Sequence, residues 1–308
     1  MQIYNMENEK HEQIAGAACG AIAFFIWGLS PLYWKVLKTV PALEVIMHRV
    51  VWSFVFLFPI IFIQGKWEEF VKVLKKPRIL IILLFTAFFV AFNWLIYIWS
   101  VNNGHIIEAS LGYYINPLVN VLLGVIFLKE RLRVFQLIAV IFACAGVLCL
   151  TFYYGKFPWV SLTLAFSFGF YGLIRKVVSV GSLTGLCIET LLLSVPAGVY
   201  LIYLQFHDTG AFLNNGAVID TFLAGSALVT ALPLLLFILG TKRLNLSTIG
   251  FLQYIAPTCM FLLGVFVYNE PFSRVQVITF SLIWTALGIY SFDSMINYKK
   301  MQKKSGLI

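Results

Sequence analysis

The sequence predicts an all-α integral membrane protein whose ten transmembrane helices form two inverted repeats of five helices each. Three observations predict this fold class: the composition, the length of the apolar runs and an internal repeat. Of the 308 residues, 61% are hydrophobic and only 11% are charged, whereas a soluble domain is about 45–50% apolar and about 25% charged. So few charged side chains cannot cover a surface that faces water, and lipid must therefore surround most of the chain.

Ten continuous apolar runs, each about 20 residues long, recur along the chain and predict the individual helices. At a rise of about 1.5 Å per residue, such a run spans a hydrocarbon core of about 30 Å. Their continuity excludes a membrane β-barrel, because barrel strands alternate apolar and polar residues. The predicted helices cover residues 14–34, 43–64, 79–101, 105–128, 133–153, 157–177, 183–205, 218–240, 246–268 and 273–293.

The basic residues predict the orientation of the helices. With the N-terminus in the cytoplasm, 17 of the 22 lysines and arginines fall on the cytoplasmic side and four on the other, while Arg49 lies inside a helix. Cytoplasmic loops carry such an excess of positive charge. We therefore expect residues 1–13 and 296–308 to form cytoplasmic tails. The net charge of +9 then reflects topology and lipid headgroups rather than binding to nucleic acid.

The second half of the chain repeats the first. Residues 114–117 (YINP) match residues 254–257 (YIAP), and polar positions further along match at the same offset of 140. We assign residues 14–153 to the first repeat and 157–295 to the second. Because each repeat has an odd number of helices, the two must insert with opposite orientations. Inverted repeats are typical of secondary transporters, whose substrate sites lie near the membrane midplane between the halves.

Polar and aromatic side chains near the predicted midplane are candidates for lining a substrate cavity. Polar groups at this depth are costly unless they have partners, and they usually face the interior of the bundle. Hydrogen bonding between helices is the alternative role for the same residues. The cavity candidates are Trp27, Ser30, Asn93, Tyr97, Tyr113, Asn116, Asn120, Ser167, Tyr171 and Gln253.

Two prolines occupy equivalent positions near the middle of two predicted helices, Pro117 and Pro257. A proline removes one backbone hydrogen bond and frees a carbonyl one turn earlier. In lipid, that carbonyl needs a partner or a wet cavity. The prolines therefore predict kinks along a transport path, with kinks that serve only packing as the alternative.

Three ionisable side chains lie inside predicted helices: His48, Arg49 and Glu189. His48 or Glu189 could take up a proton and couple it to transport. Arg49 could have a structural role, or pair with a carboxylate or an anionic substrate group. Glu189 is the repeat partner of His48, so inversion separates it in depth from Arg49 by about 10 Å or more. We therefore expect no direct pair between Arg49 and Glu189.

Glu130 and Glu270 end equivalent helices, and each stands just before the next predicted helix. A carboxylate at that position can accept hydrogen bonds from the free amides of a helix N-terminus. We expect each to cap the helix that follows it.

Several segments resemble a known family. They are residues 43–54 (LEVIMHRVVWSF), 93–103 (NWLIYIWSVNN), 108–120 (EASLGYYINPLVN), 188–190 (IET) and 250–258 (GFLQYIAPT). Together they resemble the RarD-type branch of the EamA transporters, within the drug/metabolite transporter superfamily. The resemblance implies ten helices in two inverted repeats around a central cavity, in the cytoplasmic membrane of a bacterium. It also implies secondary active transport of a small metabolite or drug-like solute by alternating access, without fixing the solute or the coupling ion.

The alternatives are a membrane-embedded enzyme and a receptor or channel that does not transport by alternating access. The sequence has no HExxH motif and no Walker A loop, and its five cysteines have no metal-ligand spacing. We therefore expect no enzymatic activity, no cofactor and no metal. The expected partners are a small-molecule substrate and the lipid bilayer; both monomer and homodimer remain open.

Overall fold

The computed structural model describes residues 2–102, 106–155, 157–267 and 273–304, and this part of the chain is helical without any β-strand. Within it, ten helical segments are long and apolar enough to cross a membrane, which confirms the predicted all-α fold and its ten spans. Nine spans are single helices: α1 (Gln2–Trp34), α2 (Ala42–Ile63), α4 (Pro77–Asn102), α5 (Ile106–Leu128), α6 (Val134–Tyr154), α7 (Trp159–Val177), α8 (Ser182–Phe206), α9 (Ala217–Arg243) and α12 (Arg274–Lys304). The ninth span along the chain consists of α10 (Leu246–Gln253) and α11 (Ile255–Phe266).

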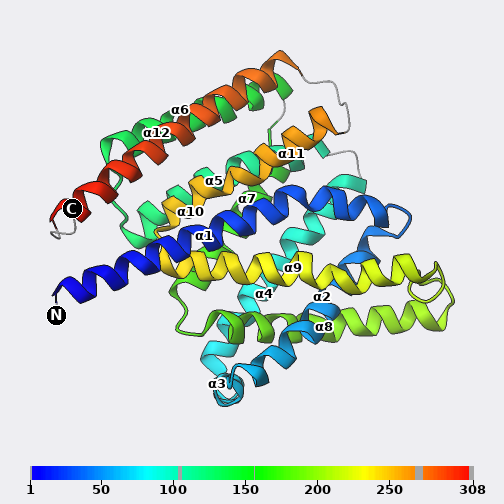
Figure 1. Ribbon diagram of the computed structural model, residues 1–308. Helices are drawn as coiled ribbons and strands as arrows, with labels where there is room; N and C mark the ends of the chain where they lie inside the picture. Colours follow the sequence, from blue (N-terminus) through cyan, green and yellow to red (C-terminus); the bar gives the residue numbers. More distant parts are fainter. Residues whose placement is uncertain (1, 103–105, 156, 268–272, 305–308) are drawn as a thin grey trace.

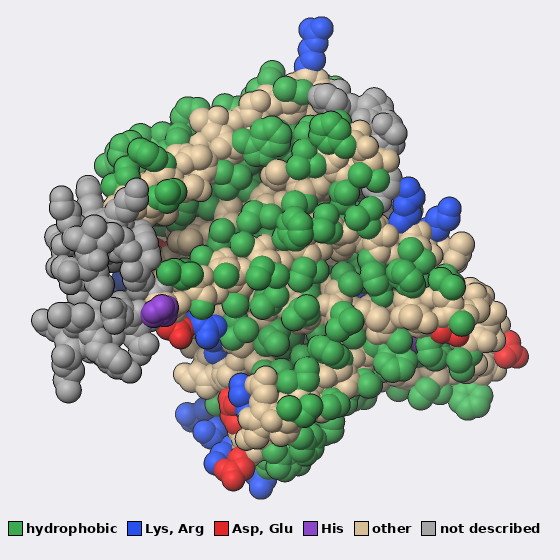
Figure 2. Space-filling model, viewed as in Figure 1, with side chains coloured by type: hydrophobic (Ala, Val, Ile, Leu, Met, Phe, Trp, Pro, Cys, Tyr) green, Lys and Arg blue, Asp and Glu red, His purple; other side chains and the backbone are tan. Residues whose placement is uncertain are grey.

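The surface has the polarity of a membrane protein. Figure 2 shows apolar side chains spread over the middle of the visible face and charged side chains gathered toward its edges. Large exposed hydrophobic side chains include Phe85, Phe88 and Val199 on α4 and α8. Such a band of apolar side chains fits contact with lipid tails.

Both ends of the chain are more helical than predicted. The helix α1 already begins at Gln2, and α12 continues to Lys304, so the predicted polar tails extend the first and last helices. The segment 2–13 contains no glycine or proline and is rich in Glu, Gln and Lys, which favour helix. Apolar periodicity could not reveal these turns because they carry few apolar residues.

A short helix that the sequence analysis did not predict, α3 (Trp67–Leu74), follows α2. Phe70 and Val73 are buried, whereas Glu68 and Lys72 are exposed and pair at 3.0 Å. The Trp67 ring stacks on Phe70, with ring centroids 5.6 Å apart. With eight residues α3 is too short to span a bilayer. Figure 1 shows it at the lower edge of the molecule, beside the ends of α2 and α8.

The two mid-helix prolines have different effects on the backbone. The ninth span breaks at Tyr254, between α10 and α11. Pro257 has no N–H to offer the carbonyl of Gln253, which explains a break one turn before it. In contrast, α5 runs through Pro117 as one helix. Of the two prolines, Pro257 thus follows an interruption of its span, whereas the kink expected at Pro117 stays a prediction.

The helices pack in pairs that respect the internal repeat. Equivalent helices contact each other in three pairs: α2 with α8, α5 with α10, and α6 with α12. Figure 1 shows the α6–α12 pair along one edge of the molecule. The remaining large contacts occur twice, once for each repeat. The helix α1 packs on α9 and α11, and its equivalent α7 packs on α4 and α5. In the same way, α2 packs on α9, and its equivalent α8 packs on α4.

Two glycines at equivalent positions permit the close approach of these helices. A methyl group at Gly28 would lie 2.6 Å from Cys259 Cβ on α11. A methyl group at Gly169 would lie 2.8 Å from Val119 Cγ1 on α5. Because both distances are below van der Waals contact, only glycine lets α1 meet α11 and α7 meet α5 this closely.

Candidate functional site

A cavity of about 780 Å³ lies between the spans, in the half of the molecule away from the chain termini. Side chains of nine of the ten spans reach it; α8 does not contribute. It reaches the surface beside Lys38, an exposed residue in the loop before α2. Its volume lies within the range of about 300–1,000 Å³ that is typical of small-molecule sites.

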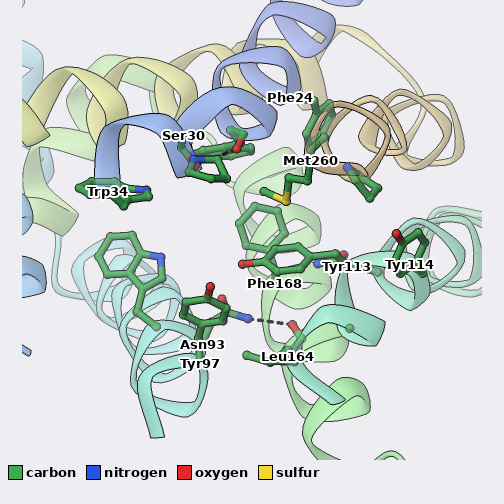
Figure 3. A pocket seen from close by; sticks show the side chains of 18 of the residues that line it. Phe24, Ser30, Trp34, Asn93, Tyr97, Tyr113, Tyr114, Leu164, Phe168 and Met260 are labelled. Carbon is green, nitrogen blue, oxygen red and sulfur yellow. Dashed lines mark hydrogen bonds between the residues drawn. The ribbon is translucent and has the colours of Figure 1, made fainter. Parts of the chain in front are cut away.

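Seven of the ten cavity candidates line this space. Figure 3 shows Ser30 of α1 opposite Asn93 and Tyr97 of α4, with Tyr113 of α5 reaching between them. The seven are Trp27, Ser30, Asn93, Tyr97, Tyr113, Asn116 and Gln253. Pro257 also lines the cavity, whereas Pro117 does not. Whether these residues contact a solute stays a prediction.

Asn120, Ser167 and Tyr171 lie outside the cavity lining because neighbouring side chains engage them. Asn120 Nδ2 donates to Gln253 Oε1 at 2.7 Å and so joins α5 to α10. Ser167 Oγ accepts from Asn93 Nδ2 at 2.9 Å, beside the Asn93 bond to the Leu164 carbonyl (Figure 3). For these three the alternative role of joining helices fits the structure, and whether any of them contacts a solute stays a prediction.

Arg49 of α2 faces the cavity and is held by three neighbours from three other helices. Its Nε donates to Thr230 Oγ1 of α9 at 2.9 Å. Its Cζ lies 4.6 Å from the ring centroid of Trp34 on α1 and 4.9 Å from that of Trp94 on α4. These distances fit cation–π contacts with both indoles. Sequence analysis missed Trp34, Trp94 and Thr230, since nothing in the local sequence singles them out.

The charges around the cavity are of one sign. Arg49 and Lys38 belong to the lining, and no Asp or Glu in the described part of the chain does. No described carboxylate forms a salt bridge with Arg49. The guanidinium therefore faces the cavity without a counter-ion from the described protein.

His48 lies on the side of α2 away from the cavity. Its Nε2 is 3.9 Å from Glu44 Oε1, and its ring lies beside that of Phe212 with centroids 5.1 Å apart. Glu44 Oε1 also accepts from the backbone N–H of Ala211 at 2.6 Å. These contacts attach the loop before α9 to α2, which makes His48 part of a structural contact here.

Glu189 is buried toward the opposite end of the bundle and does not contact Arg49, as predicted. Its Oε1 lies 3.5 Å from Arg175 Nε and accepts from Thr86 Oγ1 at 2.5 Å. Its Oε2 accepts from Tyr171 OH at 3.3 Å. Arg175 is fully buried. Arg175 is one of the 17 cations assigned to the cytoplasmic side from the sequence. Its burial could not be predicted, because a cation near a helix end looks the same in the sequence whether it faces lipid headgroups or protein.

Further polar contacts join helix ends on the same side as Arg175. Glu69 of α3 accepts from the backbone N–H of Gly181 at 2.9 Å and from Thr184 Oγ1 at 2.8 Å, at the start of α8. Lys242 of α9 donates to the carbonyls of Val178 and Val180. We call the Arg175–Glu189 pair together with Glu69 and Lys242 the terminal-side network. It closes the bundle on the side where the two termini lie.

Glu130 caps a helix, but not the one that follows it. Its carboxylate accepts from the backbone N–H groups of Leu246 at 2.6 Å and Ser247 at 2.9 Å, at the start of α10. The next helix is capped by Gln136, whose Oε1 accepts from the N–H of Arg133 at 3.0 Å. Gln276 does the same for α12 through Ser273. Glu270 lies outside the described residues.

The spans and the cavity define a class of protein: a multi-pass membrane protein with a solute-sized cavity inside its helix bundle. The chain matches the EamA-like transporter family twice, over residues 14–152 and 158–292. It belongs to this family.

Named relatives agree with this assignment. The chain is 47% identical to "Uncharacterized transporter YojE" of Bacillus subtilis, covering 94% of this chain and 97% of that protein. It is 43% identical to "Protein RarD" of Escherichia coli, over 94% and 97% of the two chains. A solved structure, 18% identical, superposes with a TM-score of 0.69 over 90% of this chain and 97% of that chain, which shows the shared fold alone. Family and relatives thus indicate a transporter rather than an enzyme.

Proposed function

We propose that the protein is a secondary active transporter that moves a small organic solute across the bacterial cytoplasmic membrane by alternating access. One observation carries the proposal: the cavity lies between helices of both repeats and reaches one surface, while the terminal-side network closes the opposite side. This arrangement supports entry of a solute from the side of Lys38. Transport then requires a second state in which the network opens and the cavity mouth closes.

The pairing of helices supports inverted repeats as the basis of that second state. The largest helix contacts have counterparts when the repeats are exchanged, and each repeat contributes five spans. An odd number of spans gives the repeats opposite orientations. Exchanging the conformations of the two repeats would therefore turn a cavity open on one side into one open on the other.

The distribution of basic residues supports cytoplasmic termini, since Lys and Arg concentrate on the terminal side. With that orientation, the cavity faces the outside and the closed network faces the cytoplasm. The cavity lies within one chain, which supports a single chain as the transporting unit. Import, export, proton coupling and exchange are all compatible with this arrangement.

Flux through the purified protein in liposomes tests the proposal. The vesicles are loaded with single solutes from a metabolite panel, and exchange of labelled solute is followed with and without a pH gradient. We expect at least one solute to move faster than in empty liposomes. No flux for any solute, together with catalytic turnover of a membrane substrate, would favour the alternative of a membrane-embedded enzyme.

Cavity variants link that flux to the site. Tyr113→Ala and Asn116→Ala remove side chains from the lining and should lower flux at least about tenfold while the protein stays folded. Tyr203→Ala is the matched control, because Tyr203 lies near the end of α8, outside the cavity, and more than half exposed. Unchanged flux in both cavity variants would place the transport path elsewhere.

A further inference from the structure

We propose that the transported solute is an organic monoanion, a carboxylate on an apolar or aromatic body, and that Arg49 binds its carboxylate between the indoles of Trp34 and Trp94. This inference rests on the proposed function, because it assigns the solute class to the same cavity. Three features of the cavity support it: the lack of a described counter-ion for Arg49, the geometry of the guanidinium and the apolar character of the remaining walls.

The first feature is the missing counter-ion. Arg49 lies within a span, about one-third of the way along α2, and is only partly exposed. Charged side chains inside the membrane are costly and normally pair with an opposite charge. Thr230 offers the guanidinium a hydroxyl, and Trp34 and Trp94 offer it two aromatic faces. The phenols of Tyr97 and Tyr113 also interact with it, but no described residue of the lining is a carboxylate. An anionic solute would supply the missing charge.

The second feature is geometry. A guanidinium presents a planar fork that binds a carboxylate through two parallel hydrogen bonds. Thr230 accepts from Nε, and the rings of Trp34 and Trp94 lie near the guanidinium from two further helices. These contacts fix the orientation of the fork, and among the described residues none forms a hydrogen bond with its terminal nitrogens. Arg49 is thus held in position before a solute arrives, which limits the ordering cost of binding.

The third feature is the character of the remaining walls. Aromatic rings of Phe24, Trp27 and Phe168 and the Met260 side chain line the same cavity, and Figure 3 shows Phe24, Phe168 and Met260 facing it. Such walls gain free energy by burying apolar surface. The other lining cation, Lys38, is exposed at the mouth. One inner guanidinium matches one negative charge, so a dianion would bring an unmatched charge into the cavity.

Calorimetric binding to the purified full chain in lipid nanodiscs tests the solute class with matched sets of an acid, its amide and an amine. The probes are phenylacetate, phenylacetamide and phenethylamine; hexanoate, hexanamide and hexylamine; and cyclohexanecarboxylate with its amide and amine. In at least one set we expect the acid to bind at least about tenfold more tightly than the amide and the amine. The proposal is wrong if no acid binds more tightly than its amide, or if the amines bind most tightly. This comparison needs no variant, so it does not depend on a substitution that folds.

Variants then assign the charge recognition to Arg49. Arg49→Met should abolish the preference for acid over amide while leaving amide binding within about twofold, since the apolar walls remain. Arg49→Lys should retain part of the preference, because the charge stays and the fork is lost. Lys72→Met, which removes an exposed cation on α3, is the control and should change nothing. A preference that survives in folded Arg49→Met protein would refute the role of Arg49.

Flux measurements separate this inference from the proposed function. Transport of a neutral or cationic solute that persists in Arg49→Met would leave the transporter assignment standing and overturn the monoanion proposal. Tight binding of an acid without flux of any solute would overturn the transporter assignment, while the role of Arg49 in binding a monoanion would stand.

Discussion

The location of a side chain in the bundle could be predicted from the sequence where its depth in the membrane alone decides its environment. Asn116 was placed near the midplane by counting along its helix, Tyr113 by sharing its helical face, and Gln253 as the repeat equivalent of Tyr113; all three line the cavity. In contrast, the surroundings of Arg49 come from Trp34, Trp94 and Thr230 on three other helices. Helical periodicity gives the face of a residue on its own helix but not which neighbouring helix meets that face. That information exists only in the packed bundle.

The close helix crossing at Gly28 gives a prediction at the residue scale. Gly28→Ala would place a methyl group 2.6 Å from Cys259 Cβ and 3.0 Å from the Ala256 carbonyl oxygen. Overpacking of this kind costs about 1–3 kcal/mol. We therefore expect a lower apparent unfolding temperature in detergent and a smaller yield of monodisperse protein. Gly198→Ala is the control, because no atom lies within 4 Å of the added methyl; equal stability of the two variants would contradict the packing argument.

Among the helices, the sequence predicts the long apolar spans well and the short or polar ones poorly. The sequence did not predict α3, whose eight residues include both apolar and charged side chains, nor the helical turns of the polar tails. It also assigned Glu130 to the wrong helix. Adjacency in sequence suggested α6, whereas the fold brings the start of α10 to the carboxylate. A capping signal indicates that an acceptor is available, but the tertiary fold decides which amides reach it.

The contact between α3 and α8 gives the first prediction at the element scale. Glu69→Ala removes both hydrogen bonds to the start of α8 and should lower stability by about 1 kcal/mol, the usual cost of a lost helix cap. The adjacent Glu68→Ala removes only an exposed pair with Lys72 and should cost less than about 0.5 kcal/mol. Thermal unfolding in detergent measures both. If Glu68→Ala proved the more damaging, α3 would not be anchored through Glu69.

The buried Arg175–Glu189 pair gives the second prediction at this scale. Glu189→Gln removes the negative charge and leaves the fully buried Arg175 uncompensated, which costs about 3–5 kcal/mol for a buried pair. Because this pair belongs to the closed terminal side, we expect that side to open more readily. A thiol-reactive probe should then modify the buried Cys187 of α8 faster than in the unmodified protein.

The matched control is Glu12→Gln, which breaks a more exposed ion pair with Arg243 on the same side. It should leave the modification rate of Cys187 nearly unchanged. Equal rates in folded Glu189→Gln and in the unmodified protein would show that the pair does not hold this side closed.

At the scale of the whole molecule, composition and apolar runs were enough to predict ten spans, because the bilayer fixes both the length and the polarity of each span. The internal repeat indicated which helices are equivalent, and their contacts follow that equivalence. What could not be predicted is the side on which the cavity opens. Two inverted repeats can adopt two arrangements of open and closed sides, related by a pseudo-two-fold axis in the membrane plane, and one sequence must encode both. The open side is a property of the conformation rather than of the sequence pattern.

The orientation of the molecule in the membrane gives the last prediction. With the five native cysteines replaced by alanine, Asn215→Cys introduces one thiol in the exposed loop before α9, on the cavity side, and Glu68→Cys introduces one on α3. A membrane-impermeant maleimide should label Asn215→Cys in intact cells and Glu68→Cys only after lysis, because the basic residues concentrate around α3 and the termini. The reverse pattern would place both termini outside. It would also make the cavity face the cytoplasm, so that Arg49 would bind an anion from inside the cell rather than from the medium.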